Sequence, residues 1–237
     1  MKKVKNASEL LWLLGILFVA LGVAICSKAN LGVSMIAAPA FVVNEALASL
    51  WNGFSVGVTE YILQGVLLVL LCAIVGRWNW RYLLAFAVAV FYGYVLDFFL
   101  WLLGGLSFDA VWLRWLMLVI GDVITAFGVA CFFRTYMPLQ VYELFVSEFA
   151  NRFRIDINKT KLFFDLSLLA ISVVLALALF GDLRTFDWAN SFHSIGLGTL
   201  LTTAINSPLI RLMGKLIDRI FDASPRFSKL EIYLKRN

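Results

Sequence analysis

The feature that most constrains this chain is a series of long apolar runs, each close in length to one membrane crossing. A helix that crosses about 30 Å of bilayer hydrocarbon needs about 20 mostly apolar residues. The last run is the most polar, because it contains Asn206, Ser207 and Pro208. The sequence therefore predicts an all-α membrane protein with about six transmembrane helices, over residues 10–26, 56–75, 82–103, 111–133, 162–180 and 194–217.

The composition agrees with this class. Of the 237 residues, 62% are hydrophobic and 15% are charged, and the mean hydropathy is +0.90. A soluble domain is nearer half apolar and a quarter charged. The composition thus argues against a soluble enzyme, a nucleic-acid binder and a disordered protein. We expect one membrane domain over residues 1–237, with membrane lipid as its first partner.

Two shorter segments, 34–50 and 136–150, differ from the long runs because they carry several polar residues and a proline. Pro39 and Glu45 lie in the first segment, and Pro138 lies in the second together with Gln140, Glu143 and Glu148. Polar or irregular backbone survives at membrane depth only against protein or water. We predict two short half-helices, re-entrant or along the interface. The alternative is two more full spans, which gives eight.

The distribution of lysine and arginine favours six spans. With a cytoplasmic N-terminus, 17 of these residues fall inside and three, Lys28, Arg114 and Arg184, fall outside. Cytoplasmic loops carry the excess of positive charge, and the eight-span alternative gives a weaker asymmetry. We therefore predict that both termini are cytoplasmic and that 104–111 and 181–192 are external.

The two halves of the chain resemble each other. The pattern Gly15-x6-Gly22-Val-Ala recurs as Gly121-x6-Gly128-Val-Ala, a shift of 106 positions. A second match, shifted by 101, joins Phe54-Ser-Val-x-x-Thr59 to Ile155-Asp-Ile-x-x-Thr160.

Each half contains three spans, so the second half begins on the opposite side of the membrane. The sequence therefore predicts two inverted structural repeats, as in many transporters. Repeat one covers about 8–104, repeat two covers about 111–217, and 218–237 forms a basic cytoplasmic tail. With eight spans the repeats are parallel instead.

Two motifs resemble those of the YczE-type bacterial integral membrane proteins (the YczE/YyaS/YitT group). They are Gly22-Val-Ala-x6-Leu31-Gly32-Val-Ser34 and Ile195-Gly196-x-Gly198-Thr199-x6-Asn206-Ser207-Pro208-Leu209-Ile210. Met35 stands where this group has proline, and Ser207 stands where it has glycine. The resemblance implies a multi-pass protein of the plasma (inner) membrane, in a group described as transport-related.

Ionisable residues inside the runs are the candidate site. A charge at mid-bilayer costs about 2.5–3.5 kcal/mol on insertion scales, so each needs a partner or a water-filled cavity. Asp97 lies inside its run, with Tyr94 beside it and Gly93 one turn earlier. We expect Asp97 to line a cavity and to contact Asn206 of the other half. The alternative is a hydrogen-bonded strut between helices.

The other candidates lie on matching helices of the two halves. Glu60 and Gln64 are four residues apart, and so are their repeat equivalents Lys161 and Asp165. Residues at this spacing share a helix face, which predicts a substrate or proton site between the halves. For Glu60 and Lys161, the alternative is contact with headgroups at span ends. Asp122 is the last of these candidates. The segment Asn206 to Pro208 is either a broken helix that marks a binding site or a plain kink.

These features favour a small secondary transporter or permease for an unidentified small molecule or ion. The substrate- or ion-binding residues we predict are Asp97, Asp122, Asn206, Asp165, Glu60, Gln64 and Tyr94. Two alternatives stay open: a membrane substrate-binding subunit of a larger importer, and a non-transporting regulatory membrane protein. A homodimer is compatible with all three.

Enzymatic chemistry has little support in the sequence. The three cysteines lie singly in apolar runs and His193 is the only histidine. This set forms no metal site and no nucleophile–base pair. We therefore expect no enzymatic activity, no cofactor, no metal ion and no nucleic-acid partner.

Overall fold

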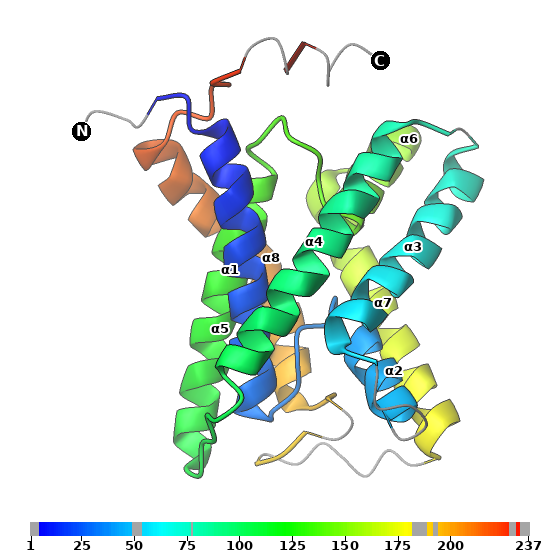
Figure 1. Ribbon diagram of the computed structural model, residues 1–237, viewed down its shortest axis with the longest axis vertical. Coiled ribbons are helices and arrows are strands. Elements are labelled where there is room, and N and C mark those ends of the chain that lie inside the picture. The colour runs from blue at the N-terminus through cyan, green and yellow to red at the C-terminus, as the bar shows by residue number, and fades with distance from the viewer. Residues whose placement is uncertain are drawn as a thin grey trace.

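The protein is all-α, as the sequence predicts. The computed structural model describes residues 5–48, 54–76, 78–181, 189–191, 194–227 and 231–232. In these residues the regular elements are α1 (Ser8–Ala29), α2 (Ala38–Ala48), α3 (Val56–Val75), α4 (Arg81–Leu102), α5 (Val111–Phe132), α6 (Val141–Phe153), α7 (Ile157–Phe180) and α8 (Leu197–Ile220). Figure 1 shows the start of α1 and the end of α8 at the same end of the helical bundle. The predicted external segment 181–192 lies partly outside the described residues, at 182–188 and 192, and Arg184 and His193 also lie outside them.

Five helices, α1, α3, α4, α5 and α7, are long and apolar enough to cross a membrane. They contain 20 to 24 residues, which corresponds to about 30–36 Å at about 1.5 Å per residue. Five of the six predicted spans are thereby confirmed. The sixth corresponds to α8, which has 24 residues but is too polar to qualify by composition within the described chain.

The two short segments form the short helices α2 and α6. Within the described residues α2 has 11 residues and α6 has 13. At about 1.5 Å per residue, α6 is only about 20 Å long and is too short to cross the hydrocarbon alone. The alternative with eight full spans is therefore wrong.

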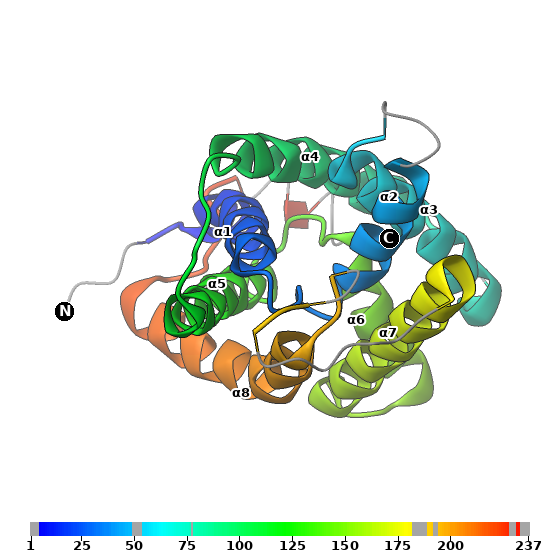
Figure 2. The ribbon, with the colours of Figure 1, turned by 90° about the horizontal axis from the view of Figure 1, so that it is seen from below.

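The helices form two groups that share α4. One core joins side chains of α1, α4 and α5, and another joins α3, α4, α6 and α7. Viewed from below in Figure 2, α1, α5 and α8 lie together on one side, and α2, α3, α6 and α7 lie on the other. The short helices pack crosswise, since α2 contacts α7 and α6 contacts α3. Each short helix therefore packs against a long helix from the other half of the chain.

Glycines bring α1 and α5 into close antiparallel contact. A Cβ atom on Gly22 would lie 2.5 Å from the carbonyl oxygen of Gly121, and one on Gly121 would lie 2.8 Å from that of Gly22. Two turns away, Gly15 and Gly128 meet in the same way, at 3.2 and 2.9 Å. Small residues allow helix backbones to approach this closely within a membrane. The α1–α5 pair forms the tightest seam of its group.

The helix α8 runs without interruption through Asn206, Ser207 and Pro208. Proline removes a backbone donor and frees a carbonyl one turn earlier. The hydroxyl of Thr203 donates to the carbonyl oxygen of Thr199 at 2.6 Å, in the turn before Pro208. Of the two alternatives for this segment, the broken helix is wrong, because the chain stays helical on both sides of the proline.

Candidate functional site

Buried polar side chains gather where α6 enters between α3 and α7. We call this group the central polar cluster: Glu60 and Gln64 of α3, Tyr142 and Glu143 of α6, and Lys161 and Asp165 of α7. All six side chains belong to buried residues. The sequence predicts Glu60, Gln64, Lys161 and Asp165 as matching pairs on two helices, and α6 is the element that links the pairs.

The first link joins α3 to α6. The Tyr142 hydroxyl donates to Oε2 of Glu60 at 3.0 Å. The carboxyl groups of Glu60 and Glu143 lie close enough to interact electrostatically. Like charges at such a distance disfavour simultaneous ionisation of both groups. A bound cation or a proton would therefore stabilise this pair of carboxyl groups.

The second link joins α6 to α7. Nζ of Lys161 lies 2.6 Å from Oδ1 of Asp165, and both side chains are buried. Glu143 is within electrostatic range of Lys161 and of Asp165. Lys161 thus interacts with two carboxyl groups, those of Asp165 and Glu143, and Glu143 in turn lies near Glu60.

The first turn of α7 fixes where Lys161 lies. Asp156 caps the helix and accepts from the backbone amides of Asn158 and Lys159 at 3.0 and 3.1 Å. These amide donors lower the pKa of Asp156, since they favour its charged form. A cap of this kind fixes the helix start, so Lys161 and Asp165 fall on the face that meets α6.

Several polar atoms of the cluster have no hydrogen-bond partner among the described residues. They are both amide atoms of Gln64, Oε2 of Glu143 and Oδ2 of Asp165. A neighbouring cavity of about 10 Å³ reaches Glu60 and Glu143 from α1 and α5, which is about the room that one water needs. Buried polar groups almost always have partners. Such an excess of free donors and acceptors suits a site that receives water or a polar ligand.

Asp122 of α5 and Asn206 of α8 are two further buried polar residues, on helices that contact each other. Both side chains are buried, and their polar atoms have no hydrogen-bond partner within the described chain. Asp122 lies within electrostatic range of Cys26 of α1. In the described residues, neither Asp122 nor Asn206 shares a hydrogen bond with the central polar cluster.

Asp97 of α4 is hydrogen-bonded to the start of α3. Its carboxylate accepts from the Ser55 hydroxyl at 2.6 Å and from the Gly57 amide at 2.8 Å, at the N-terminus of α3. The predicted contact with Asn206 is wrong, because both hydrogen-bonded partners of Asp97 lie in its own half. The strut alternative describes its geometry. An anion near a helix N-terminus is stabilised by the helix dipole, so Asp97 holds the start of α3 against the second half of α4.

Tyr94 points away from these groups. Its exposed fraction is 65%, on the outer face of α4. Conversely, sequence reasoning did not select Tyr142 or Glu143 as site residues. The available signal was a carboxylate in a short, otherwise apolar segment, which predicts burial against protein. No group of three His, Cys, Asp or Glu side chains suited to a metal ion occurs in the described part of the chain.

The apolar helices, the buried short helices and the polar residues between them define a multi-pass helical membrane protein. The chain belongs to a family of unknown function, DUF6198, whose sequence profile matches residues 7–215. No curated protein and no solved structure is significantly similar to it. The family supports the predicted membrane architecture, while the narrower YczE-type resemblance stays a prediction.

Proposed function

We propose that this protein is a small secondary transporter or permease of the bacterial plasma membrane, in which buried carboxylates bind a small-molecule or ion substrate. The observation that carries the proposal is the central polar cluster, where Glu60, Glu143, Lys161 and Asp165 converge from three helices. Charged residues within a membrane domain are costly and mark substrate or proton pathways.

Reciprocal glycine contacts support an architecture of two inverted repeats. Under the shift of 106, Gly15 corresponds to Gly121, and Gly22 corresponds to Gly128. Gly15 packs on Gly128, which is the equivalent of Gly22, and Gly22 packs on Gly121, which is the equivalent of Gly15. This is the pattern of a two-fold axis. Because α1 and α5 are antiparallel, that axis is perpendicular to both helices and lies in the membrane plane.

The starts of α3 and α7 support the same relation. The hydroxyl of Thr59 donates to the carbonyl oxygen of Ser55 at 3.1 Å, and that of Thr160 donates to Asp156 at 3.1 Å. Ser55 and Asp156 cap the two helices. The crosswise packing of α2 on α7 and of α6 on α3 is also reciprocal. In this architecture α8 is the sixth span.

The orientation we propose has both termini in the cytoplasm. In the part of the chain that the structure describes, the basic residues gather at the end of the bundle where both termini lie, except Lys28 and Arg114. Lys28 ends α1 and Arg114 begins α5, at the opposite end. The positive-inside rule assigns the basic end to the cytoplasm.

Proton flux in proteoliposomes tests the transport proposal. Vesicles that contain the purified protein and the pH indicator pyranine are given a panel of small metabolites, one at a time. We expect at least one compound to drive a pH change in the wild type. Glu143→Gln should slow the change about tenfold or more, as for loss of a proton-transfer group.

Asp109→Asn is the matched control, because Asp109 is an exposed carboxylate in the α4–α5 loop, and it should retain the wild-type rate. Equal rates in Glu143→Gln and wild type would contradict the role of the cluster. No flux above empty vesicles for any compound would contradict proton-coupled transport.

A further inference from the structure

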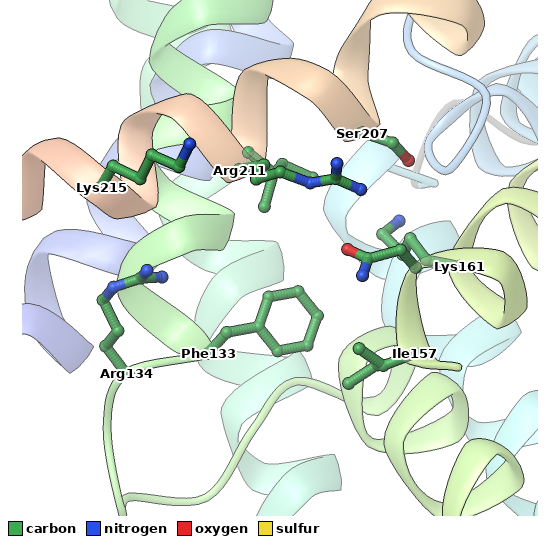
Figure 3. A pocket seen from close by; sticks show the side chains of 9 residues that line it. Phe133, Arg134, Ile157, Lys161, Ser207, Arg211 and Lys215 are labelled. Carbon is green, nitrogen blue, oxygen red and sulfur yellow. The ribbon is translucent and has the colours of Figure 1, made fainter. Parts of the chain in front are cut away.

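A second cavity lies at the end of the bundle where α1 begins and α8 ends, and Lys161 is the one residue that it shares with the central polar cluster among the described residues. Its volume is about 360 Å³, within the range of small-molecule sites. Residues from the end of α5, the start of α7 and the second half of α8 line it: Phe133, Arg134, Ile157, Asn158, Lys161, Ser207, Ile210, Arg211 and Lys215. We call it the basic pocket. Figure 3 shows the Arg211 guanidinium reaching toward Ser207 and Lys161 across the space.

The charges of the basic pocket are only half compensated. Four cationic side chains line it, and no acidic residue is among the lining residues. Two of the four have acidic partners, because Arg134 pairs with Asp218 and Lys161 pairs with Asp165. Arg211 and Lys215 have no ion-pair partner within the described residues. The pocket therefore presents two unpaired positive charges.

The spacing and polarity of the lining fit one type of ligand. Arg211 and Lys215 are four residues apart on α8, so both face the same space. The Ser207 hydroxyl oxygen is buried and has no hydrogen-bond partner in the described chain. Phe133, Ile157 and Ile210 form an apolar wall beside these groups. The pocket thus combines two cations and a free hydroxyl with an apolar surface.

We propose that the basic pocket binds a phosphate monoester, whose two negative charges match Arg211 and Lys215 and whose substituent packs on the apolar wall. At neutral pH such a group carries about −1.5 to −2 charges and offers three strong acceptor oxygens. A soluble phosphate monoester and the headgroup of phosphatidic acid share this chemistry. The proposal does not depend on transport, because the groups that would bind the phosphate, Arg211, Lys215 and Ser207, are not members of the central polar cluster.

The soluble source is tested with purified protein in neutral detergent. Glycerol 1-phosphate should raise the thermal midpoint in a saturable way, and glycerol should leave it unchanged. The double variant Arg211→Gln/Lys215→Gln should weaken the apparent affinity about tenfold or more, as for loss of charge-assisted hydrogen bonds. The control Arg219→Gln/Arg226→Gln removes the same charge from exposed positions outside the pocket and should bind like the wild type.

The lipid source is tested in nanodiscs of phosphatidylcholine that contain phosphatidic acid or, for comparison, phosphatidylglycerol. Native mass spectrometry should show phosphatidic acid retained by the wild type and by the control variant, and lost from the double pocket variant. A positive result in either arm supports the proposal and identifies the source. Binding in neither arm, or equal loss of binding in the two double variants, overturns it.

Discussion

The contact between α3 and α4 provides a sharp test of the structure through Gly57→Ala. A Cβ atom at position 57 would overlap the carbonyl oxygen of Gly93 and would lie 2.5 Å from Oδ2 of Asp97. One of these atoms is backbone and the other belongs to the carboxylate that holds the start of α3. The added methyl group therefore forces the two helices apart and disturbs the hydrogen bond between Asp97 and the Gly57 amide.

The magnitude follows from two effects. Overpacking costs about 1–3 kcal/mol, and loss of a hydrogen bond to a charged group costs about 1.5–3 kcal/mol. The two effects overlap, so we expect the free energy of unfolding to fall by about 3 kcal/mol. For a chain of this length the thermal midpoint should fall by about 6–12 °C. Fluorescence-detected size-exclusion chromatography after heating measures this shift in detergent.

Gly65→Ala is the matched control in the same helix. The nearest atom to a Cβ at position 65 is a ring carbon of Phe86 at 3.2 Å, and this ring is a side chain that can move. Alanine also has a higher helix propensity than glycine, by up to about 1 kcal/mol. We expect this variant to stay within about 3 °C of the wild type. Equal midpoints for Gly57→Ala and Gly65→Ala would refute the close contact of α3 with α4.

Three further predictions concern other helix contacts. Gly22→Ala and Gly121→Ala should each lower the thermal midpoint, because both place Cβ against backbone and overpacking costs about 1–3 kcal/mol; a loss confined to one variant would contradict the reciprocal seam. Lys161→Met should destabilise the protein by about 3–5 kcal/mol by leaving Asp165 unpaired, and adding Asp165→Leu should recover most of that loss; denaturant titrations of the single and double variants measure both, and an additive double variant would contradict the ion pair. The folded-state pKa of Asp156 is lowered, so its contribution is complete above the ordinary carboxyl pKa of 3.8 and is lost as pH falls below it; the midpoints of wild type and Asp156→Ala should converge on acidification, and a constant difference would contradict the cap.

The membrane spans are largely predictable from the sequence, because burial in lipid requires long apolar runs. The ends of the helices are harder to predict. The helix α7 begins at Ile157, five residues before the apolar run at 162. The start is earlier because Asp156 caps the helix there and because the polar residue Lys161 lies within the helix but outside the apolar run. The short helices were also predictable, because proline and carboxylates within a brief apolar segment exclude a full span.

The partners of polar residues were not predictable, since they depend on where other helices begin. Asp97 and its nearby glycine indicated a close helix contact, and the structure supplies one. The partner is the start of α3 at Gly57, which no local pattern around Asp97 reveals. Similarly, Glu143 becomes central only because the α6 N-terminus enters between α3 and α7.

The crosswise packing of the short helices has a consequence for synthesis of the chain. The helix α2 ends at Ala48, and its long-helix partner α7 begins only at Ile157. At about 5–20 residues per second, the ribosome needs roughly 5–20 s to make the intervening segment. Until then, Val42 of α2 lacks Ala176 of α7, with which it shares a buried apolar cluster. During this interval we expect α2 to lie in the membrane interface or against a chaperone. The first half of the chain therefore reaches its final packing only after the second half has been made.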